Sequence, residues 1–149
     1  MKYALLILVG VIVLGGIWFL GQTAELPKKD NKTTPTATIN GHELNLEVMR
    51  ESQERSRGLS QKDVLAENAG MLFIFESPGV PGFWMKDMNF SIDIIWIGSH
   101  KRVVDITENL APETFPEVFK PKAPVQYVLE VNAGWAKDHN IAIGDKVLF

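Results

Sequence analysis

The sequence predicts a small α+β domain, mainly β, built as a compact antiparallel barrel or a strongly curved sheet with two short helices and preceded by one N-terminal transmembrane helix. Short apolar runs recur along the chain, separated by turns rich in Gly, Pro, Asn and Ser, which indicates about seven strands. Only two short stretches carry helix signals. The chain opens with an uncharged apolar segment, and its 149 residues leave room for a single globular domain.

The N-terminal segment, residues 3–20, contains no charged residue and is rich in Leu, Ile and Val. At about 1.5 Å per residue, a helix of this length nearly crosses a hydrocarbon layer of about 30 Å. We therefore expect residues 1–21 to be a membrane anchor or signal segment. Cleavage after Ala24 is the alternative and would give a secreted or periplasmic protein, although Gln22 makes that site a poor one.

Residues 22–36 are rich in Lys, Asp, Thr and Pro, which predicts a polar linker, and residues 37–149 form the predicted globular domain. A short N-terminal tail followed by an anchor usually leaves such a domain outside the cytoplasm. We therefore expect a single-pass protein of the cytoplasmic membrane, held there through residues 3–20.

The predicted domain begins with a hairpin, because an Asn-Gly turn joins residues 37–39 to the alternating residues 42–49. Ser52 is expected to cap a short helix that ends at Gly58 in the left-handed conformation. Residues 70–76 are apolar on both faces, as expected of a central strand. After a turn-rich loop, further strands are predicted at residues 83–88, 91–97, 102–106, 125–131 and 146–148, with a second short helix at 133–139.

Composition excludes several kinds of chemistry. The chain has no cysteine, which excludes disulfides, thiolate nucleophiles, iron–sulfur clusters and Cys-type zinc sites. His42, His100 and His139 lack ligand spacing, so neither a metal nor a cofactor is expected. Beyond Ala24 there are 14 Lys and Arg against 18 Asp and Glu, a net charge of about −4 that disfavours nucleic acid as a partner. The sequence also lacks a nucleophile elbow, a phosphate loop and a dinucleotide fingerprint.

Five ordered motifs carry a family resemblance. They are Arg-Gly-Leu at 57–59, Gly-Met-Leu-Phe-Ile-Phe at 70–75, Phe-Trp-Met-Lys at 83–86, Ile-Asp at 92–93 and Leu-Glu-Val-Asn-Ala-Gly-Trp at 129–135. From about His42 to Phe149 the chain resembles domain of unknown function 192, a family of small bacterial and archaeal proteins. The resemblance implies export or anchoring but no particular activity.

The chain departs from that family pattern at two places. Residues 85–88 read Met-Lys-Asp-Met where the family usually has Met-Lys-Asn-Thr, and Ser91 stands where a proline is common. If the Asn and Thr side chains contact a ligand in the family, that contact is altered here.

Charged residues interrupt apolar runs at three places, at Lys86, Asp93 and Glu130. A buried unpaired carboxylate costs several kcal/mol or takes up a proton, so Asp93 and Glu130 are expected to have partners. Arg57 is the expected partner because its planar guanidinium can donate two hydrogen bonds to a carboxylate.

Two interpretations of these charges stay open. They form either a structural ion-pair network or one concave site with Trp84 and Trp135 as its walls. Two carboxylates beside Trp faces would suit a glycan, and cations beside aromatic rings would suit an anionic envelope ligand.

Three functional hypotheses follow. The first is a non-enzymatic module that binds a small envelope ligand or partner through Arg57, Lys86, Trp84 and Trp135. The second is a small hydrolase in which Asp93 and Glu130 act as acid and base. The third is a scaffold for another membrane protein, which would show a broad exposed apolar patch and no pocket.

Overall fold

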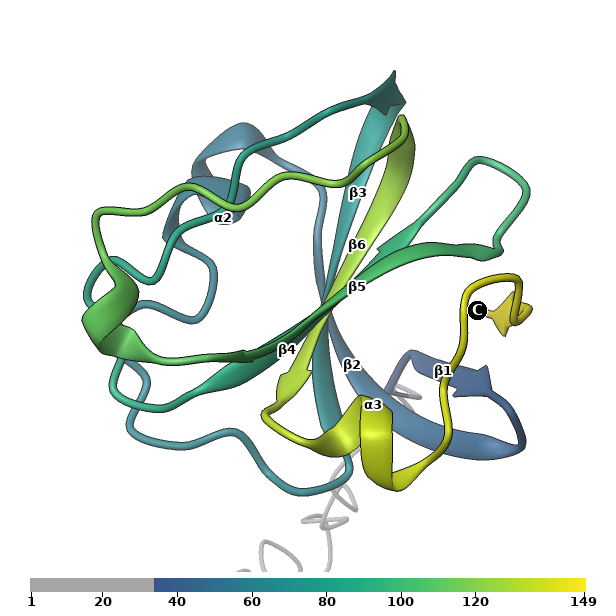
Figure 1. The fold of residues 1–149 in the computed structure, drawn as a ribbon, viewed down its shortest axis with the longest axis horizontal. Coiled ribbons are helices and arrows are strands. Elements are labelled where there is room, and N and C mark those ends of the chain that lie inside the picture. The colour runs from purple at the N-terminus through teal and green to yellow at the C-terminus, as the bar shows by residue number, and fades with distance from the viewer. Residues whose placement is uncertain (1–33) are drawn as a thin grey trace, which may run out of the picture. The chain divides into compact units, whose positions relative to one another are not determined.

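Seven strands form one strongly curved sheet, a half-barrel, in the computed structural model, which describes residues 34–149 (Figure 1). Their order across the sheet is β5-β4-β6-β3-β2-β1-β7. The strands are β1 (Thr36–Ile39), β2 (His42–Met49), β3 (Ala69–Gly79), β4 (Ile92–Ile97), β5 (Val103–Leu110), β6 (Val125–Asn132) and β7 (Val147–Leu148). The helices are α2 (Ser52–Arg57), α3 (Trp135–Asp138) and the 3-10 helix η2 (Pro112–Thr114). The predicted curved, mainly β sheet with two short helices is confirmed.

The sheet is mixed, which corrects the prediction of a purely antiparallel one. Strands β2 and β3 pair in parallel, from Asn45 opposite Ala69 to Met49 opposite Phe73. Parallel neighbours need a crossover connection of about a dozen residues or more. Residues 50–68, which include α2, form this crossover, so α2 stands at the end of β2 and leads back to the start of β3.

The two edges of the sheet meet at one end. The amide of Val103 donates to the carbonyl of Asp145 at 2.9 Å, and the amide of Val147 donates to the carbonyl of Lys101 at 2.9 Å. These bonds connect the start of β5 to the segment that contains β7. They hold the sheet in its curved form by tying its first and last strands together.

The predicted strand at residues 83–88 is wrong. Only Phe83 pairs, in an isolated bridge with Phe119, and the chain then turns through Lys86 and Asp87. Asp87 has a positive φ of 56°. The turn buries both Met85 and Met88. These buried residues give the segment the apolar pattern that predicted a strand.

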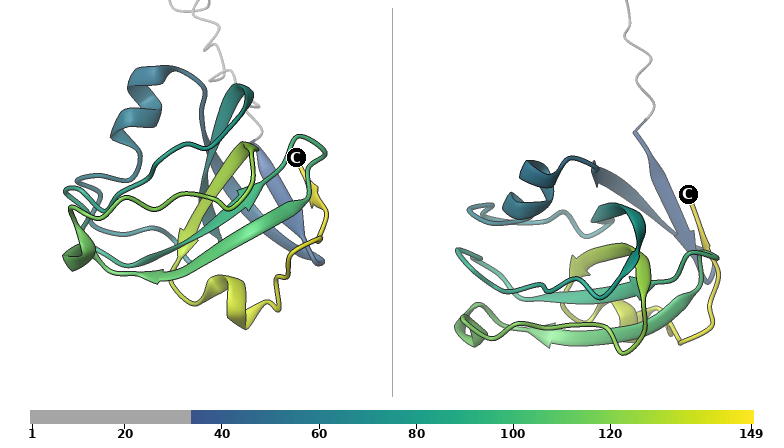
Figure 2. Two further views of the ribbon diagram at one scale, coloured as in Figure 1. Left: turned by 45° about the horizontal axis from the view of Figure 1, so that its top comes forward. Right: turned by 90° about the horizontal axis from the view of Figure 1, so that it is seen from above.

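Two hydrophobic cores lie on opposite faces of the central strands, because successive residues of a strand point to opposite faces. From β4, Ile95 and Ile97 enter one core, which also contains Trp135 of α3, and we call it the α3 core. Ile94 and Trp96 enter the other, which contains Leu59 just after α2, and we call it the α2 core. Figures 1 and 2 show α2 and α3 on different sides of the strands.

Within residues 34–149, no helix is long and apolar enough to span a membrane. The predicted anchor, residues 1–21, and the predicted linker as far as residue 33 lie outside the described residues. The described part of the chain begins its regular structure with β1, whose bounds are Thr36–Ile39.

Candidate functional site

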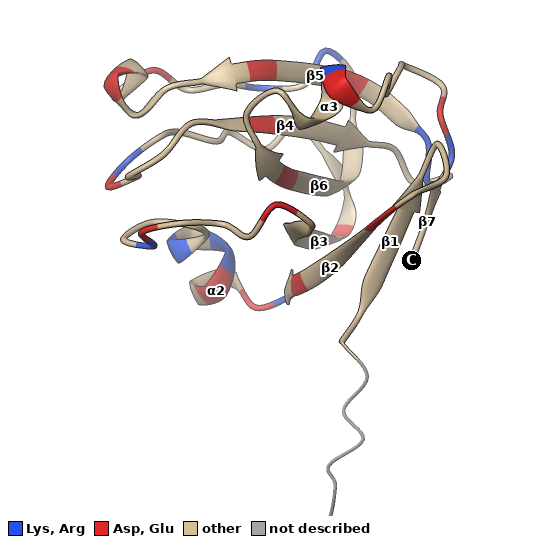
Figure 3. Cartoon of the chain, turned by 90° about the horizontal axis from the view of Figure 1, so that it is seen from below, with Lys and Arg blue, Asp and Glu red and all other residues tan. Residues whose placement is uncertain are grey.

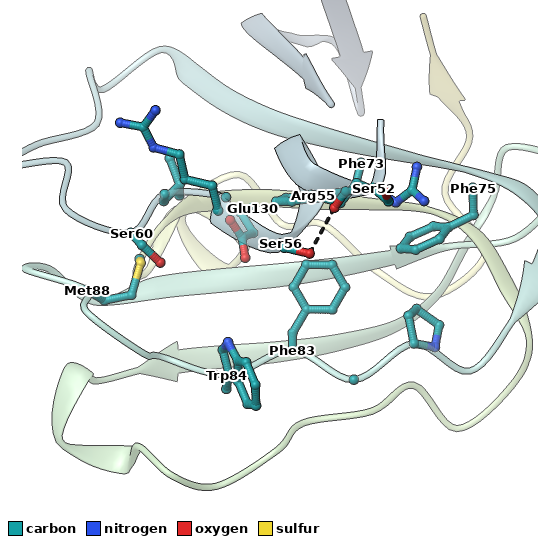
Figure 4. A pocket seen from close by; sticks show the side chains of 15 residues that line it. Ser52, Arg55, Ser56, Ser60, Phe73, Phe75, Phe83, Trp84, Met88 and Glu130 are labelled. Carbon is teal, nitrogen blue, oxygen red and sulfur yellow. Dashed lines mark hydrogen bonds between the residues drawn. The ribbon is translucent and has the colours of Figure 1, made fainter. Parts of the chain in front are cut away.

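An open cavity of about 320 Å³ lies beside α2, over the α2 core. Its α2 side carries serines and arginines, and the aromatic rings of Phe83 and Trp84 lie across from them, with one carboxyl between (Figure 4). The main lining residues are Ser52, Arg55, Ser56, Arg57, Phe73, Phe75, Phe83, Trp84, Met88 and Glu130. A volume of this size is at the lower end of small-molecule pockets, which run from about 300 to 1,000 Å³.

Helix α2 is short and buries no residue, so its position depends on hydrogen bonds. Glu51, and not the predicted Ser52, is its N-cap residue, and it forms a capping box with Glu54. Gly58 ends the helix with φ 51° and ψ −134°, which is not the predicted left-handed helical conformation. An added Cβ at Gly58 would lie 3.4 Å from the Phe73 ring, so the end of α2 lies directly on the aromatic wall.

The loop after α2 is tied to the turn that follows Trp84. The Ser60 hydroxyl donates to the carbonyl of Lys86 at 2.9 Å, and the Gln61 amide donates to the carbonyl of Asp87 at 2.8 Å. These two bonds bring α2 and the segment carrying Trp84 to the same cavity.

Among residues 34–149, Glu130 is the single carboxyl in the lining. It lies on β6 between Met71 of β3 and Ile94 of β4, and only 6% of its surface is exposed. Among the described residues, its Oε2 is the one buried side-chain nitrogen or oxygen without a hydrogen-bond partner. Burial raises the pKa of Glu130 to about 8, so the carboxyl is mostly protonated at neutral pH. In Figure 4 it points into the cavity.

The two arginines of α2 differ in their contacts. Arg55 donates to the carbonyls of Arg50 and Ile74, and its guanidinium lies 5.0 Å from the centre of the Phe75 ring. Arg57 makes no side-chain hydrogen bond or ion pair with any residue in the range 34–149. The predicted pairing of Arg57 with Asp93 or Glu130 is therefore wrong. Figure 3 shows the basic residues of α2 and the acidic residues of β4 and β6 on separate elements.

The aromatic wall is held by edge-to-face contacts. Phe83 packs against Phe73 with ring centroids 5.0 Å apart and against Trp96 at 5.5 Å. Trp84 is 54% exposed and contacts Phe115 at 6.4 Å. The phenylalanines thus form a fixed inner wall, and Trp84 stands at the mouth.

Asp93 is directed to the other face of the sheet. Its Oδ1 accepts hydrogen bonds from the amides of Asn109 at 2.8 Å and Gly134 at 3.1 Å, and its Oδ2 accepts one from Ala136 at 3.0 Å. It is fully buried where α3 begins. Because Ile94, and not Asp93, is the neighbour of Glu130, the two carboxyls point to opposite faces and cannot act on one bond. The predicted acid and base pair is wrong.

Comparison with known families identifies the domain. The family model for DUF192, described as an uncharacterized ACR, matches residues 35–149. This chain belongs to the DUF192 family. The family resemblance predicted from the five motifs is confirmed.

One sequence relative and two solved structures are similar to this DUF192 chain. A UPF0127 protein of Pyrococcus abyssi is 34% identical over 90 residues, covering 56% of this chain and 71% of that protein. A crystal structure of a protein of unknown function from Novosphingobium aromaticivorans has a TM-score of 0.74 at 32% identity, covering 78% of this chain and 85% of that one. A Sinorhizobium meliloti protein, described as a candidate transcription regulator, has a TM-score of 0.73 at 29% identity, covering 78% and 93%.

The DUF192 cavity gathers half of the predicted site residues, namely Arg57, Trp84 and Glu130. Lys86 is exposed and is not part of the lining. Trp135 is 7% exposed and belongs to the α3 core, where it stacks on His139 with ring centroids 4.4 Å apart. The interpretation that all six residues form one site is therefore contradicted: β4 and α3 place Asp93 and Trp135 on the far face, and Lys86 lies in an exposed turn outside the lining.

Sequence reasoning missed the polar wall of the cavity. Ser52, Arg55 and Ser56 are spaced by three and four residues, which places them on one face of a helix, and this spacing was a usable signal. The inner wall of Phe73 and Phe83 had no such signal, because buried phenylalanines are ordinarily core residues. Within residues 34–149, no group of three or more His, Cys, Asp or Glu is arranged to hold a metal ion.

Proposed function

We propose that this DUF192 domain is a binding module for a small ligand that occupies the cavity beside α2 and contacts Glu130. The observation that carries the proposal is the Glu130 carboxyl, whose Oε2 is buried, has no hydrogen-bond partner among residues 34–149 and adjoins an open cavity. A buried polar group without a partner costs about 1–3 kcal/mol. A ligand that supplies the missing hydrogen bond would recover that free energy.

The shape of the cavity supports binding better than the two other hypotheses. A hydrolase that uses two carboxyls is contradicted, because Asp93 is bonded to three backbone amides on the opposite face. A pure scaffold would expose apolar surface without a pocket, whereas here the exposed Trp84 stands at the mouth of one. A glycan site with two carboxyls and two Trp walls also loses support, since only Glu130 and Trp84 reach the cavity.

The proposed place of action is the outer face of the cytoplasmic membrane. The uncharged residues 3–20 and the polar residues that follow support this location. A contact with DNA, suggested only by the description of the Sinorhizobium relative, is not proposed because the net charge of −3 disfavours it. A C-terminal fusion to alkaline phosphatase, which needs disulfides and hence an oxidising compartment, tests the location. An inactive but stable fusion would contradict it.

A cavity-filling variant tests the binding function. Ser56 lines the cavity, and Gln53, on the same helix, does not. We expect Ser56→Trp to abolish binding of small molecules found by ligand-observed NMR screening of the full-length chain. Gln53→Trp adds the same ring outside the lining and should bind as the unaltered chain does. If no compound binds, or if every bound compound binds Ser56→Trp equally well, the proposed function is wrong.

A further inference from the structure

The charges that face the cavity are of one sign. Of the described elements around Glu130, only α2 brings formal charge to the lining, through Arg55 and Arg57. The lining residues from β3 and from the segment 81–84 are apolar or uncharged. Arginine stays protonated at any pH that a folded protein tolerates. With Glu130 mostly protonated, the cavity carries a net positive charge at pH 7.

The available hydrogen-bond donors belong to different parts of the lining. Arg55 already donates to two backbone carbonyls and covers Phe75, whereas the Arg57 guanidinium has all its donors free of side-chain partners among the described residues. At the inner side, a protonated Glu130 offers one O–H donor from a buried position. Both groups therefore favour hydrogen-bond acceptors, and Arg57 favours a negatively charged one.

The aromatic part of the lining and the volume of the cavity indicate the size and polarity of the uncharged part of the ligand. Phe73 and Phe83 form a rigid edge-to-face pair with ring centroids 5.0 Å apart, and Trp84 is half exposed beside them. Rings of this kind bury apolar and planar groups well. A cavity of about 320 Å³ has room for one ring-sized group and a short substituent, and it is too small for a chain of several sugars or a peptide.

We propose that the cavity selects a small organic anion, a carboxylate carried on an aromatic or branched apolar body, with Arg57 as the charge partner and the Glu130 carboxyl as the inner hydrogen-bond donor. The apolar body lies against Phe83 and Trp84. This ligand class rests on the proposed binding function and goes beyond it by fixing the charge and shape of the ligand.

The binding of such an anion is linked to pH through Glu130. Ionisation of Glu130 removes its donor and places a second negative charge beside the ligand. With a pKa of about 8, the protonated fraction falls from nearly all at pH 6.5 to roughly one part in thirty at pH 9.5. The affinity for the anion should therefore fall on the order of thirtyfold across this range.

Three matched probes test the ligand class on the full-length chain: phenylacetate as the anion, phenylacetamide as the neutral analogue and phenethylamine as the cation. We expect phenylacetate to bind most tightly at pH 6.5 by NMR titration and phenethylamine least. Arg57→Met should weaken phenylacetate binding about tenfold, since it removes a charge-assisted hydrogen bond. Arg50→Met is the matched control because Arg50 carries the same charge just before α2 but is not a lining residue, and it should change little.

The pH dependence gives a second and independent readout. Phenylacetate affinity should fall on the order of thirtyfold between pH 6.5 and pH 9.5 in the unaltered chain and stay nearly constant in Glu130→Gln, whose amide does not titrate. Tighter binding of phenethylamine, or a phenylacetate affinity equal at both pH values in the unaltered chain, would overturn the ligand class.

The two proposals fail differently. If phenethylamine binds the unaltered chain most tightly and Ser56→Trp loses it, the binding function stands and the inferred anion is wrong. If none of the three probes binds, and a wider screen also finds nothing that Ser56→Trp loses, the binding function itself is wrong.

Discussion

Asp93 and Glu130 are buried carboxyls on neighbouring strands, and they differ in what the rest of the fold supplies. Asp93 accepts hydrogen bonds from three backbone amides at 2.8–3.1 Å, whereas Glu130 has an oxygen without any partner among the described residues. The Asp93 side is closed by α3, and the Glu130 side adjoins a cavity. Asp93 therefore stabilises the fold, whereas Glu130 lowers its stability and is tolerated. Burial alone therefore does not assign a role to a charged residue.

The largest expected effect is at Asp93. Asp93→Asn replaces an acceptor oxygen by an amide group that faces backbone donors, so it should lower the free energy of unfolding by about 3 kcal/mol. Urea unfolding at pH 7 measures this change. A loss below about 0.5 kcal/mol would show that the three amides do not depend on the carboxylate and that Asp93 does not stabilise the fold.

Replacement of Glu130 should raise the free energy of unfolding, in contrast to replacement of Asp93. The pKa of Glu130 is raised from 4.5 to about 8 on folding, so the stability it contributes is complete below about pH 4.5 and is lost as the pH rises through 8. At pH 7 most of that loss has occurred, because the unfolded chain ionises there and the folded chain does not. Glu130→Gln avoids the loss and should be about 1–3 kcal/mol more stable than the unaltered chain at pH 7.

Unfolding of Glu130→Gln and of the unaltered chain is compared at pH 7 and pH 4.5. The stabilisation should fall to about 0.4 kcal/mol at pH 4.5, where Glu130 is protonated in the folded state and about half protonated in the unfolded chain. A destabilised Glu130→Gln at pH 7 would mean that the carboxylate has a partner and that the two carboxyls are alike.

Trp84 extends the comparison to the cavity mouth. Because its side chain is about half exposed, Trp84→Ala should lower the free energy of unfolding by only about 0.5 kcal/mol. It should nevertheless weaken probe binding by roughly tenfold, since the ring is a wall of the cavity. Calorimetric unfolding and NMR titration measure the two effects, and a large loss of stability with unchanged binding would assign Trp84 to the core.

The smallest expected effect is at an exposed ion pair. Lys62 contacts Glu47 at 2.7 Å, and their side chains are 37% and 49% exposed. Glu47→Gln should change the free energy of unfolding by at most about 0.5 kcal/mol, because water screens such pairs. Urea unfolding of this variant measures the effect of an exposed carboxylate for comparison with the buried Asp93 and Glu130. A change in the free energy of unfolding as large as that of Asp93→Asn would show that burial makes no difference.

Much of the fold follows from local pattern. Because side chains alternate along a strand, Asp93 lies on the face of Ile95 and Ile97, and Glu130 lies on the face of Val128. The Asn40-Gly41 hairpin also forms as predicted. These features depend on residues close together in the chain, which is why the sequence alone is sufficient for them.

The relation between the two carboxyls is not local. The register that pairs Ile94 with Glu130 joins residues 36 positions apart in the sequence, and it decides that the two carboxyls face opposite ways. The amides that satisfy Asp93 come from Asn109, Gly134 and Ala136, which no spacing rule connects to it. The Arg57 side chain could pair with a carboxylate, but its position prevents this. Helix α2 places Arg57 in the cavity lining without an ion pair to Asp93 or Glu130.

The ionisation of Glu130 decides whether its carboxyl is a neutral hydrogen-bond donor in a ligand site. The measurement is a pH titration of side-chain carboxyl ¹³C shifts in the full-length chain, with and without phenylacetate. We expect a Glu130 midpoint near 8 that moves upward when phenylacetate binds. A midpoint near the ordinary value of 4.5, or one that phenylacetate leaves unchanged while it binds, would contradict the assignment of Glu130 as the neutral anchor of a ligand site.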